Sequence, residues 1–222
     1  MAQQSFQAPS ANPFNPMTLA SLALSGEPND PSDYKKGRPI TKLLENNGRI
    51  RLSTFLNIPD VKVPPLGVEI SYHSMLVLLD EMLKISDLAE AKSPYPDGKY
   101  SIVVDSWFGK GQTRLEKPEK SCVVTVGIDG EGLCYLSIQH KNSKNIVHRF
   151  GPPYLEKIIN GAGEPIEQII LSARYFRSWA EKMKVLIPVN TIVNGKEPVK
   201  RNQSSGSSDN NSDVANSWSE FK

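Results

Sequence analysis

A period-two alternation of apolar and polar residues predicts several strands in the middle of this chain. In the run GRIRLSTFL, apolar or small residues at even-numbered positions alternate with polar or larger residues at odd ones, as expected for a strand with one buried face. The segments 121–128 and 133–140 are joined by the turn residues Asp129–Gly132, which predicts an antiparallel hairpin. Altogether the pattern predicts strands over 49–56, 100–108, 121–128, 133–140 and 145–150.

A spacing of three or four residues between apolar positions predicts two helices, at 72–88 and 167–186. The first is apolar over a wide arc, which favours burial. The second should end before Pro188, because proline cannot continue the helical hydrogen bonding. Its apolar stripe is Leu171, Tyr175, Trp179, Met183 and Leu186.

This order of elements predicts an α+β fold, in which an antiparallel β-sheet carries amphipathic helices packed on one face. We expect a single nucleic-acid-binding domain at 33–200. Residues 1–32 are rich in Pro, Ser, Asn and Gln and predict a flexible N-terminal arm, and the Ser/Asn/Gly-rich residues 201–222 predict a disordered C-terminal tail.

The alternation also predicts the register of the hairpin. A turn centred near Gly130 pairs Val124 with Leu136 and places the apolar residues of both strands on one face. In that register Cys122 lies opposite Ile138 and Cys134 lies opposite Val126. Both cysteines are then predicted to be buried free thiols.

The opposite face of the sheet combines cations with aromatic rings. Such a face suits single-stranded DNA, because cations meet phosphates while rings stack on any base. The alternative is an ordinary solvated face with a few amphipathic side chains. The residues predicted to contact nucleic acid here are Arg49, Arg51, Phe55, Trp107, Tyr135, Gln139 and Arg149.

Basic residues in segments beside the sheet extend this hypothesis. The segments 34–42, 107–114 and 139–150 contain several cations and no acidic residue. On the last helix, Arg174, Arg177 and Lys184 form either ordinary surface or a further row of phosphate contacts. The additional predicted contacts in the three segments are Lys35, Lys36, Arg38, Lys110, Arg114, Lys141 and Lys144.

Composition excludes several classes of function. The net charge of the 222 residues is only +2, so electrostatic binding of a polyanion must depend on local clusters. Two cysteines without a CxxC pair and three scattered histidines predict no metal site, and no nucleotide-binding or hydrolase motif indicates a cofactor or an enzyme. No segment is apolar over the ~20 residues that a membrane span needs. We therefore expect a cytoplasmic, non-enzymatic protein, located in the host cytoplasm if it is viral.

The segments GRIRLSTF, YSIVVDSWFGKGQ, SCVVTVGIDGEGLCYLSIQHK and FRSWAEKMKVLIP give the chain a resemblance to a known class. Their pattern of a basic strand, an antiparallel sheet and a closing amphipathic helix resembles the Whirly and transcriptional-coactivator class of single-stranded DNA-binding folds. In length and polar arms the chain is also similar to single-stranded DNA-binding proteins of lytic podoviruses, of the Drc type. The resemblance covers about residues 45–190.

The resemblance implies sequence-tolerant binding of single-stranded DNA, assembly into a homo-oligomer and a role in phage DNA replication or transcription. The alternatives are an accessory factor that binds a polymerase complex, and an RNA-binding module, since the 2′-hydroxyl contact leaves no mark in a sequence. The tail, with Trp218, Phe221 and three acids, is either a simple disordered end or a site that recruits a replication or transcription protein.

Overall fold

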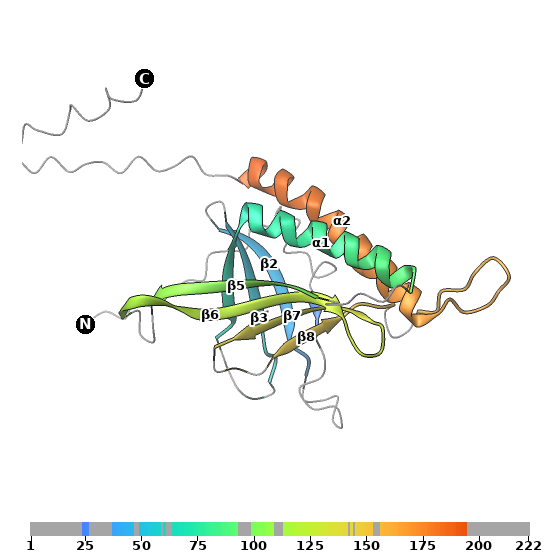
Figure 1. Ribbon diagram of the computed structural model, residues 1–222, viewed down its shortest axis with the longest axis horizontal. Coiled ribbons are helices and arrows are strands. Elements are labelled where there is room, and N and C mark those ends of the chain that lie inside the picture. The colour runs from blue at the N-terminus through green and yellow to red at the C-terminus, as the bar shows by residue number, and fades with distance from the viewer. Residues whose placement is uncertain are drawn as a thin grey trace, which may run out of the picture.

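Four strands followed by one helix occur twice along the chain (Figure 1). The computed structural model describes residues 24–26, 37–46, 49–58, 60, 64–92, 99–108, 113–141, 143, 145–152 and 156–194. The first unit comprises β1 (Leu24–Ser25), β2 (Ile40–Asn46), β3 (Arg49–Phe55), β4 (Leu66–Ser71) and α1 (Tyr72–Glu90). The second comprises β5 (Lys99–Phe108), β6 (Arg114–Ile128), β7 (Cys134–His140), β8 (Ile146–Arg149) and α2 (Gln168–Asn194).

Each unit contributes its own antiparallel sheet, sheet A in the order β1-β2-β3-β4 and sheet B in the order β5-β6-β7-β8. The predicted α+β class is confirmed, with two sheets in place of the single one that we expected. Strands of sheet A run across those of sheet B, and both helices lie on the same side of the molecule (Figure 1). Three strands escaped prediction: β1 lies within the expected N-terminal arm, β2 in a segment interpreted as a basic loop, and β4 after a proline-rich connection.

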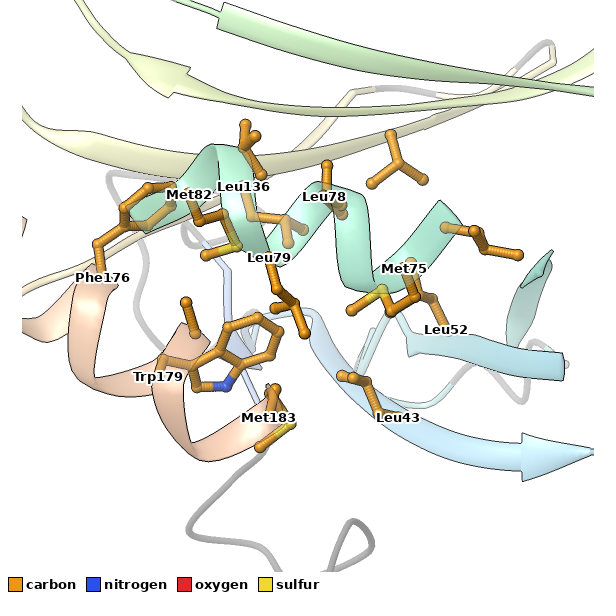
Figure 2. Packing of buried hydrophobic residues seen from close by; sticks show 14 of the residues in the cluster. Leu43, Leu52, Met75, Leu78, Leu79, Met82, Leu136, Phe176, Trp179 and Met183 are labelled. Atoms are coloured by element: carbon orange, nitrogen blue, oxygen red, sulfur yellow. The ribbon is translucent and has the colours of Figure 1, made fainter. Parts of the chain in front are cut away.

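The core lies where α1 meets the inner faces of both sheets (Figure 2). The helix begins at the N-cap Ser71, whose side chain accepts a hydrogen bond from the backbone N–H of Ser74 at 3.1 Å. Its apolar arc then buries Met75, Leu78 and Met82 completely, as its wide hydrophobic pattern predicts. Around it, the fully buried residues of sheet A include Ile50 and Leu52, and those of sheet B include Val124, Val126, Leu136 and Ile138.

The second helix closes this core with aromatic contacts. The ring of Phe150, which follows β8, packs edge-on against Phe176 and Trp179 of α2, with centroid distances of 4.9 and 5.9 Å. Such edge-to-face pairs add to the free energy of burial. The position of α2 is therefore fixed against sheet B.

Pro188 does not end the last helix, contrary to our prediction, since α2 continues to Asn194. Proline removes one backbone hydrogen bond, to the carbonyl four residues earlier. However, Ile187 and Asn190 on either side of it are fully buried, and Thr191 donates a side-chain hydrogen bond to the carbonyl of Ile187 at 2.9 Å. Packing of the final turns thus outweighs the lost bond.

The hairpin register differs from the predicted one by two residues. Val124 pairs with Ile138 and Val126 with Leu136, so Cys122 faces His140 and Cys134 faces Ile128. The reason is the turn, in which Oδ1 of Asp129 accepts the backbone N–H groups of Glu131 and Leu133 at 2.9 Å each. This turn centres the hairpin on Glu131, one residue later than expected. A shift of two leaves every side chain on its predicted face.

The two cysteines are buried free thiols, as predicted. Burial raises the pKa of Cys122 to about 11 and that of Cys134 to about 12. Both thiols are therefore neutral at physiological pH and act as small apolar core residues.

A short chain of buried polar groups joins the two sheets. The hydroxyl of Thr41 on β2 lies 2.8 Å from the hydroxyl of Thr54 on β3 and 2.8 Å from Nε2 of His148 on β8. All three residues are at most 1% exposed. Hydrogen bonds in such surroundings are costly to remove. Within the described part of the chain, no helix is long and apolar enough to cross a membrane.

Candidate nucleic-acid interface

The outer face of sheet B, which turns away from the helices, is hollowed. Alternation along β7 places Tyr135, Ser137 and Gln139 on this face, and it places their neighbours on β6 and β8 beside them. Together they line a hollow of about 490 Å³. Its rim and floor are Lys99, Val123, Thr125, Ile128, Asp129, Tyr135, Ser137, Gln139, Asn145, Val147 and Arg149.

Two other hollows share lining residues with this one. Arg149 also lines a cavity of about 460 Å³ beside the residues that precede α2. At the other end, Val123 and Gln139 also line a pocket of about 330 Å³. The hollow on the outer face of sheet B thus has a further hollow near each of its ends.

Tyr135 lines the hollow of sheet B, where its ring is half-buried. Burial is the main reason that its phenol pKa is raised above 10, and the charge of Asp129 acts in the same direction. The side chain thus remains a neutral phenol that can stack with its ring and donate its hydroxyl hydrogen. These are the properties that a sequence-tolerant contact to a base requires.

Arg149 is already compensated by acids. Its guanidinium lies 2.9 Å from a carboxylate oxygen of Asp129 and 3.2 Å from one of Glu131. Both acids belong to the β6–β7 turn, so the predicted phosphate contact also anchors that turn. Lys141 similarly forms an ion pair with Glu119, and this pairing lowers the pKa of Glu119.

The outer face of sheet A carries the other part of the predicted interface. The ammonium of Lys42 lies 5.3 Å from the centre of the Phe55 ring, in a cation–π arrangement. Arg51 approaches Glu69 at 3.7 Å. Its guanidinium lies over Gly67, so close that a Cβ at Gly67 would come within 2.7 Å of it. The missing side chain of Gly67 therefore creates the space for Arg51.

Other predicted residues lie at the margins of these faces. Arg49 and Arg38 are exposed beside sheet A. Trp107 is 50% exposed on β5, and Arg114 opens β6 at the position paired with Phe108. Lys35, Lys36, Lys110 and Lys144 lie outside the described residues.

The structure thus distributes the predicted residues over two sheets. Tyr135, Gln139 and Arg149 line one hollow of sheet B, whereas Arg49, Arg51 and Phe55 lie along one face of β3 in sheet A. Sequence reasoning missed Lys99 and Ser137 in the hollow. Alternation along β5 and β7 carries the signal for both, since they share a face with Ser101 and Tyr135.

The basic row on the last helix serves the packing of the two helices. Arg174 lies 2.9 Å from Glu90, Arg177 pairs with Asp87, and Lys184 pairs with Asp80. These partners fall at decreasing positions of α1, which shows that the two helices are antiparallel. The sequence left two interpretations open for these cations, an ordinary surface or a row of phosphate contacts. Their ion pairs with α1 favour the ordinary surface.

Comparison with known proteins gives no family assignment. No family model matches the chain, and no curated protein does. Among solved structures, the crystal structures of Trypanosoma bruciei MRP1/MRP2 align with 78% of this chain and 86% of that chain, at a TM-score of 0.37 and 8% sequence identity.

Proposed function

We propose that this protein binds single-stranded DNA without strong sequence preference, along the outer face of sheet B. The observation that carries the proposal is the hollow of about 490 Å³ on this face, which the half-buried ring of Tyr135 lines together with Lys99 and Gln139. A hollow of this kind admits unstacked bases, and a ring within it can stack on any of the four. The second strip of cations and an aromatic ring, on sheet A, supplies further contacts.

The electrostatic contribution comes from the cations that have no acidic partner among the described residues. Lys99 borders the hollow and is exposed, and Arg49 is exposed on sheet A. Cations of this kind bind phosphates by releasing counterions, which makes affinity depend on salt. Arg149 and Arg51, which face acids already, are expected to contribute less.

The role that we propose is support of phage DNA replication or transcription, in keeping with the resemblance to the Drc type of single-stranded DNA-binding proteins. An RNA-binding module is an alternative that the test below separates. Recruitment of another protein by the C-terminal tail, whose residues lie outside the described part of the chain, stays a prediction.

Binding to labelled single-stranded DNA, duplex DNA and single-stranded RNA over a range of salt concentrations tests the proposal. We expect preference for single-stranded DNA, with affinity that falls as salt rises. Arg49→Ala should reduce the log–log slope by about 0.7, the value of one phosphate contact to a single strand. Equal affinity for duplex, or binding that salt does not change, would contradict the proposal.

A protein contact is a second candidate, favoured by apolar residues on α2. Val185, Val189 and Ile192 are 63%, 47% and 82% exposed, and their spacing places them on one side of the helix. We propose that this strip, of which a second copy of the chain is the expected partner, supports a homo-oligomer. Exposed apolar groups that cluster on a surface mark such contacts.

Light scattering coupled to size-exclusion chromatography tests this assembly. The wild-type protein should run as an oligomer, and Val189→Asp with Ile192→Asp should yield monomers with an unchanged circular dichroism spectrum. Lys157→Asp, an exposed change outside α2, is the control and should leave the oligomer intact. A monomeric wild type at all concentrations would favour a different partner, such as a protein of a polymerase complex.

A further inference from the structure

Sheet B ends in a long strand, β5, whose outer edge has no strand partner among the described residues (Figure 1). β5 is ten residues long, so this edge presents a row of N–H and C=O groups with which another strand can pair. The opposite edge of the sheet is β8, which has only four residues. Gly26 lies against that edge, since a Cβ at Gly26 would come within 3.2 Å of the carbonyl oxygen of Val147. The long open edge of sheet B is therefore that of β5.

The middle of β5 lacks the residues that usually keep a sheet edge from pairing. Residues 100–104 include no charged residue and no proline, which are the residue types that block an edge most directly. Tyr100, Ile102 and Val104 are partly buried where they pack against the core, and Val103 on the outer face is 55% exposed. A long apolar edge of this kind favours contact with another strand.

Opposite charges flank this apolar run on the outer face. Lys99 and Asp105 are both exposed, and neither has an ion-pair partner among the described residues. They share a face because an even number of positions separates them, and the extra residue beside Val104, Ser121, belongs to β6 and leaves the alternation of β5 intact. When β5 meets a second copy of itself antiparallel, with Ile102 opposite Ile102, Lys99 of each copy lies opposite Asp105 of the other.

We infer that the β5 edge binds the β5 edge of a second copy of this chain in that register. Tyr100 then lies opposite Val104 on the core face, and Ser101 lies opposite Val103 on the outer face. A two-fold axis relates the two copies, so both contacts between lysine and aspartate form at once. Opposite charges at facing positions stabilise a strand pair, and like charges destabilise it. This inference goes beyond the proposed function and does not depend on DNA.

The contact is separate from the α2 strip of Val185, Val189 and Ile192, and it is the weaker of the two. Its ladder is short, and exposed ion pairs add little to affinity, so it forms only at high protein concentration. Together the two contacts join pairs of copies into larger assemblies. The outer faces of two joined B sheets lie on the same side of one continuous sheet. There Lys99 stands beside an acid, so Arg49 is expected to contribute more to phosphate binding.

Charge reversal tests both the edge and the register, with sedimentation velocity measured over a range of protein concentrations and without DNA. The wild type should associate further as concentration rises. Lys99→Asp and Asp105→Lys each place like charges opposite each other at both contacts, and each should weaken this association by about tenfold or more. Both positions are exposed, so circular dichroism should not change. Lys157→Asp, an exposed change of the same kind outside sheet B, is the control and should associate like the wild type.

An equimolar mixture of the two charge-reversal variants is the sharpest arm. One chain then carries acids at both positions and the other carries lysines at both, so unlike chains should associate as the wild type does. Recovery in the mixture would support the edge and the register together. Wild-type association in each single variant, or no recovery in the mixture, would overturn the inference. The same reversals made together with Val189→Asp and Ile192→Asp keep this outcome independent of the α2 strip, because monomers should then pair only through β5.

Discussion

The face on which a residue lies determines what its removal should do. Tyr135 and Trp179 are both large aromatic residues, but Tyr135 lines the outer hollow of sheet B, while Trp179 lies on the buried side of α2 and is 8% exposed. The strand alternation and the helical spacing predicted both placements. Substitutions at these two positions therefore separate binding from stability.

Tyr135→Ala should weaken binding to single-stranded DNA by about 1–3 kcal/mol, the contribution of one stacked base. Trp179→Ala should instead lower the free energy of unfolding by about 3–5 kcal/mol, because it leaves a cavity in the core. Fluorescence anisotropy measures the first effect and urea denaturation the second. Similar losses of stability in both variants would show that Tyr135 is a core residue.

Gly67 offers a way to displace a cation without removing its charge. A Cβ at this position would lie 2.7 Å from the Arg51 guanidinium, which is the end of a flexible side chain and can move. Gly67→Ala should therefore leave Tm nearly unchanged. If Arg51 contacts the strand in its present position, the variant should lose about as much affinity as Arg51→Ala in the same anisotropy assay. Wild-type affinity in Gly67→Ala, together with a loss in Arg51→Ala, would show that only the charge of Arg51 matters.

The buried imidazole of His140 makes stability depend on pH. Its pKa is lowered by burial, so between that value and 6.5 the unfolded chain binds a proton that the folded protein does not. Stability should therefore fall as pH decreases from 6.5 toward the lowered pKa. Denaturation at a series of pH values should show a smaller decrease in His140→Phe. The ion pair of Glu119 acts in a separate window, since its pKa is lowered from 4.5 and its contribution is lost only below that value.

At the scale of elements, the predictable features were those with a local cause. The alternation in β3 and in the β6–β7 hairpin gave the correct buried faces. In β2, two adjacent leucines interrupt the alternation, and β1 is only two residues long, so their place in a sheet depends on pairing with distant segments. The same holds for the site, because the ion pair of Arg149 with Asp129 depends on the turn geometry.

Pro188 is the clearest case of packing that overrides a local preference. Pro188→Ala restores the backbone N–H that can bond to the carbonyl of Lys184, and it should raise the free energy of unfolding by up to about 3 kcal/mol. Helical content measured by circular dichroism should stay the same or rise slightly. Ser178→Ala, at an exposed position earlier in α2, is the matched control and should change stability by only a few tenths of a kcal/mol. A loss of stability in Pro188→Ala would indicate that the proline ring itself packs in a required position.

At the scale of the whole molecule, the two sheets are expected to unfold as one unit. The core under α1 draws residues from both, and Thr41 connects β2 to β8 through its hydrogen bond to His148. Among the described residues, one hydrophobic core is shared by both sheets. A single cooperative transition follows, with equal midpoints for near-ultraviolet and far-ultraviolet circular dichroism.

Thr41→Val tests the link between the sheets, because valine keeps the shape of threonine and removes its hydroxyl. Thr41 takes part in two buried hydrogen bonds, whereas Thr54 takes part in the one that it shares with Thr41. Thr41→Val should therefore lower the free energy of unfolding by about 2–3 kcal/mol and Thr54→Val by about 1 kcal/mol. In the double variant the second change should add little, since the shared bond is already lost. Urea denaturation of the three variants measures these values. Equal and additive effects of the two single changes would mean that the contact between Thr41 and His148 contributes nothing to the joining of the sheets.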